Sequence, residues 1–174
     1  LVMIRAVIFD IGGVLAYDVW EHLLLDKEGG VASIYGLPED RVKEFGKKLW
    51  SKYDRRPATR ENEWEDFERE YWGKFIQEFR QKLPQCATVE SFILMTDEFI
   101  RDVNNERMVP LLERLQSHGI DLAICSNNNE FWFRRQMCKL ELHRFFSPSK
   151  VVLSCRIGVS KSSPRFEMFH AVAD

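Results

Sequence analysis

The sequence predicts an α/β fold in which a parallel sheet carries helices on both faces and an all-helical insert interrupts the chain. Short apolar runs alternate with amphipathic segments at both ends of the chain. These runs lack the polar alternation of a half-exposed strand, which favours strands covered by helices on both sides. Strands that alternate with helices form right-handed βαβ units, so we expect a parallel sheet.

The first apolar run, residues 4–9, is rich in β-branched residues and stops at Asp10, just before Gly12 and Gly13. It therefore predicts a buried central strand that ends in a tight loop. The other expected core elements follow the insert in chain order: a helix over 108–118, a strand over 120–125, a helix over 130–142, a strand over 151–154 and a helix from Pro164 to Asp174.

The pattern between residues 18 and 103 is helical throughout. Val42, Phe45, Leu49 and Tyr53 recur at three- and four-residue spacing, as on the apolar face of a helix. Similar stripes predict three or four helices, among them 38–53, 59–83 and 89–103. We therefore expect two units: a core made of residues 1–17 and 104–174, and a helical insert over 18–103.

Composition narrows the class of protein. The chain has 174 residues, of which 45% are hydrophobic and 30% charged, enough to bury a core. The net charge of -2 and the lack of a basic stripe argue against a nucleic-acid partner. No apolar stretch is long enough to span a bilayer, and the four cysteines form no CxxC pair. We expect a cytoplasmic protein with no membrane partner and with free thiols at Cys125 and Cys155.

Three polar side chains follow the three predicted strands. Asp10 follows the first, Ser126 and Asn127 the second, and Lys161 lies in the loop after the third. Because ligands of parallel α/β sheets bind at the carboxyl ends of the strands, we expect these side chains to face one crevice. A carboxylate, a hydroxyl beside amides and an amine together suit a phosphate group.

These segments resemble the motifs of the haloacid dehalogenase-like (HAD) hydrolase superfamily. Residues 9–15 (Phe-Asp-Ile-Gly-Gly-Val-Leu) resemble its first motif, 124–128 (Ile-Cys-Ser-Asn-Asn) its second and 158–164 (Gly-Val-Ser-Lys-Ser-Ser-Pro) its third. The helical insert resembles the cap of the subgroup that places its cap between the first two motifs. Residues 137–169 are similar to the N-terminal phosphatase domain of soluble epoxide hydrolase and to related sugar-phosphate phosphatases.

The resemblance implies a role for each residue. Asp10 would be the nucleophile that forms an aspartyl-phosphate, and with the backbone carbonyl of Gly12 it would hold Mg²⁺. Ser126 and Asn127 would bind the phosphoryl group, and Lys161 would neutralise charge. The core would be Rossmann-like, and the substrate a small phosphorylated metabolite.

The chain departs from the family pattern at two places. Many relatives carry an aspartate as general acid and base where this chain has Gly12. The fourth motif, which supplies further metal-binding carboxylates, does not follow the helix that begins at Pro164. The C-terminal part of the core would then be missing, which would leave the first strand as an open edge. We expect a partner, or a second copy in a homodimer, to cover it.

Two alternatives to a phosphatase remain open from the sequence. One is a haloacid dehalogenase, in which Asp10 attacks carbon without a metal. The other is a catalytically impaired HAD-like chain that acts as a binding or assembly module. Among residues outside the motifs, Tyr17, Asp18 and Trp20 are plausible substrate contacts, and Arg134 with Arg135 predicts a solvated helix face.

Overall fold

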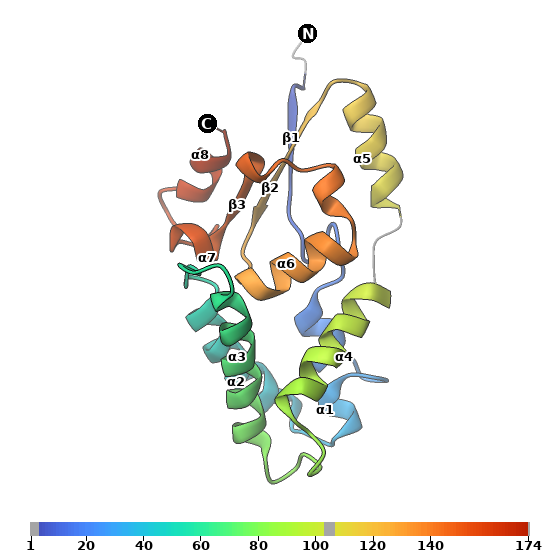
Figure 1. The fold of residues 1–174 in the computed structure, drawn as a ribbon, viewed down its shortest axis with the longest axis vertical. Helices are drawn as coiled ribbons and strands as arrows, with labels where there is room; N and C mark the ends of the chain where they lie inside the picture. The colour runs from blue at the N-terminus through green and yellow to red at the C-terminus, as the bar shows by residue number, and fades with distance from the viewer. Residues whose placement is uncertain (1–3, 103–106, 174) are drawn as a thin grey trace.

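The computed structural model describes residues 4–102 and 107–173, which form a small sheet above a bundle of helices (Figure 1). The strands are β1 (Ala6–Phe9), β2 (Asp121–Ser126) and β3 (Val151–Leu153). The helices beside them are α5 (Met108–Ser117), α6 (Glu130–Lys139), α7 (Ser154–Ile157) and α8 (Glu167–Ala173), with 3₁₀ turns η2 (Leu142–Arg144) and η3 (Pro148–Lys150). The predicted alternation of strand and helix is confirmed.

The sheet is parallel, in the order β1-β2-β3. Phe9 lies opposite Ile124 and Ser126 lies opposite Leu153, so the carboxyl ends of the three strands meet at one edge. Alternate residues of β2 point to opposite faces of the sheet, and helices cover both faces. Leu122 and Ile124 pack in one cluster with Leu112 of α5, and Ala123 packs in another with Met168 of α8. The predicted α/β fold is therefore correct.

The first strand differs from its prediction as a buried central strand. β1 lies at an edge of the described sheet, and Ile8 is 44% exposed. A run of β-branched residues is equally suited to a covered strand and to the apolar edge of a sheet, so composition alone does not separate the two. The open edge that the sequence also predicted lies along this strand.

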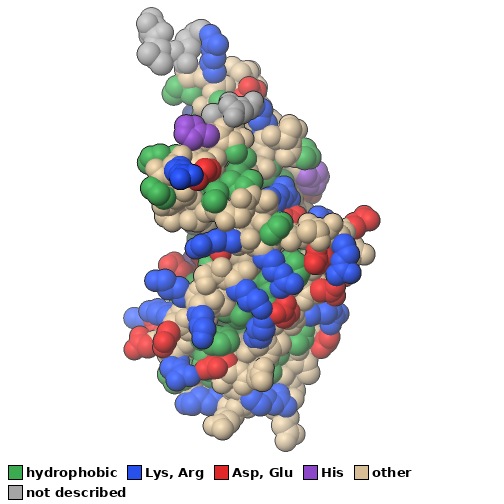
Figure 2. Space-filling model, turned by 90° about the vertical axis from the view of Figure 1, so that its left-hand side faces the viewer, with side chains coloured by type: hydrophobic (Ala, Val, Ile, Leu, Met, Phe, Trp, Pro, Cys, Tyr) green, Lys and Arg blue, Asp and Glu red, His purple; other side chains and the backbone are tan. Residues whose placement is uncertain are grey.

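The segment between β1 and α5 is helical, as predicted. It contains a π-helical turn η1 (Trp20–Leu24), α1 (Val31–Ile34), α2 (Glu39–Tyr53), α3 (Glu63–Phe79) and α4 (Val89–Asp102). α3 is shorter than its predicted range of 59–83, and Val103, where the insert was expected to end, lies outside the described residues. Lys and Arg side chains are interspersed with Asp and Glu over the helical half of the molecule (Figure 2). Across the described residues, no helix is both long and apolar enough to cross a membrane.

The helical half has an aromatic core that reaches into the sheet half. Tyr53, Tyr71 and Trp72 are buried in it, and Phe131 and Trp132 from the first turn of α6 join the same cluster. Figure 1 shows α6 at the junction between the two halves. The helix that follows the second motif is therefore the main bridge between insert and core.

The prediction of a solvated face at Arg134 and Arg135 is wrong for Arg135. Its guanidinium donates to both carboxylate oxygens of Glu68 on α3, at 2.7–3.1 Å, and to Asp97 on α4 at 3.1 Å. Glu68 is 1% exposed. Arg135 thus ties α6 to two helices of the insert, a partnership between distant segments that helical periodicity does not reveal.

Candidate functional site

The loop after β1 is a tight turn. The carbonyl of Ile11 accepts hydrogen bonds from the N–H groups of Val14, Leu15 and Ala16, at 3.1, 3.0 and 2.9 Å. Gly13 has a φ of 74°, in the left-handed region that glycine adopts without strain. The turn reverses the chain directly after Asp10 and returns it past the same edge of the sheet.

This turn brings Asp18 over Gly12. A Cβ atom on Gly12 would lie 3.1 Å from Oδ2 of Asp18, so the Asp18 carboxylate fills the space beside the bare backbone. Its Oδ1 accepts hydrogen bonds from the N–H groups of Trp20 and Glu21, at 2.8 and 3.2 Å. The two hydrogen bonds to Oδ1 therefore orient the carboxylate, and Oδ2 faces Gly12.

The structure brings three of the predicted site residues together. Lys161 Nζ forms an ion pair with Oδ2 of Asp10, and Oδ1 of Asp10 accepts a hydrogen bond from the N–H of Ile11 at 2.8 Å. The backbone N–H of Lys161 donates to Oδ1 of Asn127 at 2.9 Å. Asn127 thus ties the loop after β3 to the end of β2, which holds the lysine beside the carboxylate.

Ser126 is placed differently from its prediction. It is the last residue of β2, is 1% exposed, and is not among the residues that line the cavity beside Asp10. Its neighbours Asn128 and Asn129 support the local backbone. Asn128 donates to Gln136 at 2.8 Å, and Asn129 caps α6 by accepting from the N–H of Trp132 at 2.7 Å.

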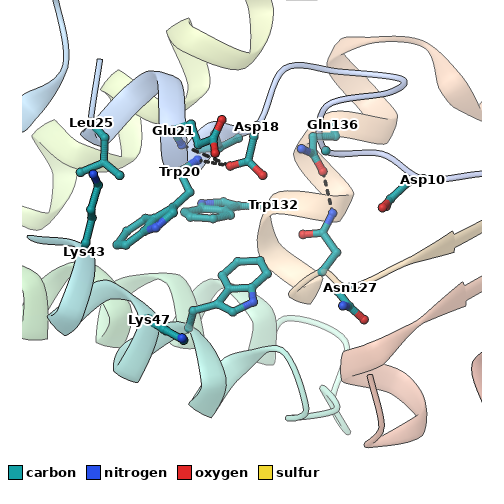
Figure 3. Close-up of a pocket in the computed structure, with 14 residues that line it drawn as sticks. Asp10, Asp18, Trp20, Glu21, Leu25, Lys43, Lys47, Asn127, Trp132 and Gln136 are labelled. Carbon is teal, nitrogen blue, oxygen red and sulfur yellow. Dashed lines mark hydrogen bonds between the residues drawn. The ribbon is translucent and has the colours of Figure 1, made fainter. Parts of the chain in front are cut away.

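A cavity of about 560 Å³ lies between the core and the insert (Figure 3). Asp10, Gly12 and Asn127 line its core side, and Asp18 and Trp20 come from the chain just after the loop. Of the three residues suggested as substrate contacts, Tyr17 is not in the lining; it is 48% exposed and its ring contacts that of His22.

Sequence reasoning missed the far wall of this cavity. Lys43, Lys47 and Trp50 of α2 and Trp132 of α6 line it. The i, i+4, i+7 spacing of the first three places them on one helix face. That spacing alone does not distinguish a ligand-facing helix from a solvated one.

Oxygen atoms near Asp10 are the donors available to a metal. Asp10 offers its carboxylate and Gly12 its backbone carbonyl, and oxygen is the ligand type that Mg²⁺ prefers. Among residues 4–102 and 107–173 there is no group of three or more His, Cys, Asp or Glu side chains that would hold an ion. The donor set fits Mg²⁺ as an ion shared with a phosphate, since Mg²⁺ sites often combine one carboxylate with phosphate oxygens and waters.

Two cysteines lie behind the site and do not provide an alternative nucleophile. Cys125 and Cys155 are buried free thiols, as predicted. Burial raises the pKa of Cys125, and it raises that of Cys155 to about 12 with the help of Glu130. Because only the thiolate is reactive, both remain inert near neutral pH.

Comparison with known proteins agrees with this geometry. The family model described as haloacid dehalogenase-like hydrolase matches residues 4–174. No curated protein matches the chain. The match covers nearly the whole sequence and includes the segments that supply Asp10, Asn127 and Lys161. The chain therefore belongs to the haloacid dehalogenase-like hydrolases.

Proposed function

We propose that this hydrolase is a phosphatase that acts on a small phosphomonoester with Asp10 as its nucleophile. The observation that carries the proposal is the ion pair between Lys161 and Asp10 at the end of the cavity, with Asn127 holding the lysine loop. A carboxylate beside a fixed cation can approach a phosphate dianion, because the cation offsets the repulsion between the two anions.

The reaction has two displacement steps at phosphorus. A carboxylate oxygen of Asp10 forms a bond to phosphorus while the bond to the ester oxygen breaks, which leaves an aspartyl-phosphate and an alcohol. Water then attacks the same phosphorus, releases inorganic phosphate and restores the Asp10 carboxylate. Lys161 stabilises the negative charge on the phosphoryl oxygens in both steps.

Each step also needs a proton carrier. The departing alkoxide must gain a proton, and the attacking water must lose one. Oδ2 of Asp18 faces Gly12, two residues from the nucleophile, and no side chain at position 12 competes for that space. We assign the proton transfer to this oxygen, in place of the aspartate that many relatives carry at position 12.

Asp10 and the Gly12 carbonyl would hold Mg²⁺ together with the substrate's phosphate. The ion would supply charge neutralisation on the phosphoryl oxygens. Asn127 is exposed and lines the cavity, so it is the side chain of the second motif that we propose for phosphoryl binding; Ser126 is buried beneath it.

We further propose that residues 18–103 act as a cap over a core formed by 1–17 and 104–174, as in the subgroup of the family with a helical cap. The cavity lies between these units and admits a metabolite rather than a macromolecule. A closed cap would exclude bulk water from the aspartyl-phosphate.

Phosphate release from 4-nitrophenyl phosphate tests the proposal, with Mg²⁺ and after its removal by EDTA. We expect activity that requires Mg²⁺ and falls at least about 10³-fold in Asp10→Asn, since that change removes the nucleophile. Asp40→Asn, at an exposed position on α2, is the matched control and should keep full activity. Folded protein, verified by circular dichroism, that releases no phosphate would refute the proposal and favour a binding module; halide release from chloroacetate without Mg²⁺ would instead indicate a dehalogenase.

A further inference from the structure

We propose that the leaving group of the substrate is a flat aromatic ring that carries a second negative charge at the end away from the phosphate. The inference rests on the phosphatase proposed above and specifies its substrate class. It follows from the middle and the far end of the cavity.

The middle of the cavity is walled by three indoles. Trp20, Trp50 and Trp132 all line it, and the rings of Trp50 and Trp132 lie 5.2 Å apart with an angle of 31° between their planes. Trp132 is 2% exposed, and the Asn129 cap holds its backbone. In Figure 3, Trp20 and Trp132 lie between Asp10 with Asn127 at one end and Lys43 with Lys47 at the other.

The position of Trp20 is set by a glycine inside α2. A Cβ atom on Gly46 would lie 1.5 Å from Cζ2 of Trp20 and 1.6 Å from Cη2. The indole therefore rests directly on the helix backbone, which any side chain at position 46 would prevent. A glycine inside a helix is unfavourable, so this residue serves the placement of the ring.

The lining favours an aromatic ring over a polyhydroxylated one. A buried hydroxyl without a partner is costly, and several polar groups of the lining are already engaged. The Asn128 amide binds Gln136, and Oδ1 of Asp18 accepts two backbone N–H groups.

Lys47 supplies the charge at the far end. Its neighbour on the helix, Lys43, pairs with Glu39, whereas no ion pair engages Lys47 within the described ranges. Lys47 lies three residues before Trp50 on α2, so its ammonium group can reach a ligand that contacts the indole. A carboxylate or second phosphate on the far side of the ring would meet this free cation.

The test compares esters of primary alcohols with similar leaving-group basicity. Benzyl phosphate and cyclohexylmethyl phosphate differ in flatness, and 4-carboxybenzyl and 4-carbamoylbenzyl phosphates differ in charge. We expect kcat/KM to favour benzyl over cyclohexylmethyl about tenfold, as for bases stacked on aromatic side chains. We expect the carboxylate to be favoured over the amide by about fivefold, as for an ion pair at an exposed site.

Three variants assign these preferences. Trp50→Leu should lose the ring preference and Trp50→Phe should retain most of it. Lys47→Gln should lose only the charge preference, and Lys47 is exposed, so the variant will fold. Lys48→Gln, next to it but lining a different cavity, is the control that should keep both.

Two outcomes overturn the inference while leaving the phosphatase intact. Equal kcat/KM within both ester pairs is one, and faster turnover of a hexose phosphate than of any benzyl ester is the other. If no ester is hydrolysed, the phosphatase proposal fails, and tryptophan fluorescence of the wild-type chain decides the inference. If 4-carboxybenzyl phosphate quenches the tryptophan fluorescence and (4-carboxycyclohexyl)methyl phosphate does not, the cavity binds aromatic anions and the inference is supported. If neither compound quenches the fluorescence, the inference is overturned.

Discussion

At the scale of single residues, Asp18 is the side chain whose chemistry can be tested most directly. We expect Asp18→Asn to slow hydrolysis of benzyl phosphate by about 10²–10³-fold, the usual cost of losing a positioned proton carrier. Hydrolysis of 4-nitrophenyl phosphate should fall much less, because its leaving group departs without a proton. The measurement is kcat/KM for both esters.

A second variant separates proton transfer from capping, since Asp18 also accepts the N–H groups of Trp20 and Glu21. Asp18→Ser keeps a capping oxygen, and the double variant Gly12→Asp with Asp18→Ser moves the carboxylate to position 12. Partial recovery of benzyl phosphate hydrolysis in the double variant is expected. An equal loss with both esters would contradict the assignment and leave Asp18 a structural role.

At the scale of elements, α2 and α3 offer a matched pair of glycines. Gly→Ala inside a helix normally stabilises a protein by up to about 1 kcal/mol. We expect Gly73→Ala in α3 to do so, because its Cβ would meet nothing closer than Val89 Cγ2 at 3.9 Å. Gly46→Ala should instead destabilise by about 1–3 kcal/mol, as overpacking does, because its Cβ would overlap Trp20. Urea denaturation gives both values, and a stabilised Gly46→Ala would contradict the close packing of Trp20.

The contact between α2 and α3 also predicts a pH dependence. Burial opposes ionisation of Glu70, but hydrogen bonds from Lys74, Lys52 and Arg56 outweigh it and lower its pKa from 4.5 to about 2. Because the pKa is lower in the folded state, the ionised carboxylate stabilises the fold above about pH 4.5, and this contribution is lost as the pH falls toward 2. In urea titrations at pH 7, 4.5 and 3, Glu70→Gln should reduce the loss of stability with acid. Glu44→Gln, exposed on α2, should leave the acid dependence unchanged.

At the scale of the whole molecule, the Arg135 ion pairs join the two halves. Arg135→Met leaves the Glu68 carboxylate buried without its partner, so we expect a loss of about 3–5 kcal/mol in the free energy of unfolding. The double variant Arg135→Met with Glu68→Met should recover most of it, because paired apolar side chains of similar volume often replace a buried ion pair at little cost. Urea denaturation measures both, and additive losses would show that the two side chains are not coupled.

Much of this architecture could be predicted because it is encoded locally. Apolar runs and helical stripes mark α2, α4, α5 and the strands within a few residues. The parallel order follows from the alternation of strand and helix. The proximity of Asp10 and Lys161 follows in turn, because the loops after parallel strands share one edge of the sheet.

The sequence by itself thus determined the fold class and the edge of the sheet at which Asp10 and Lys161 meet. The tertiary structure alone decided that Ile8 lies on an exposed edge strand, that Ser126 is buried, that Arg135 is paired, and that Trp132 and Lys47 wall the cavity. A second copy over the β1 edge stays a prediction. The reason for the division is physical: periodicity shows which side of an element is apolar, but which surfaces meet depends on how distant segments pack.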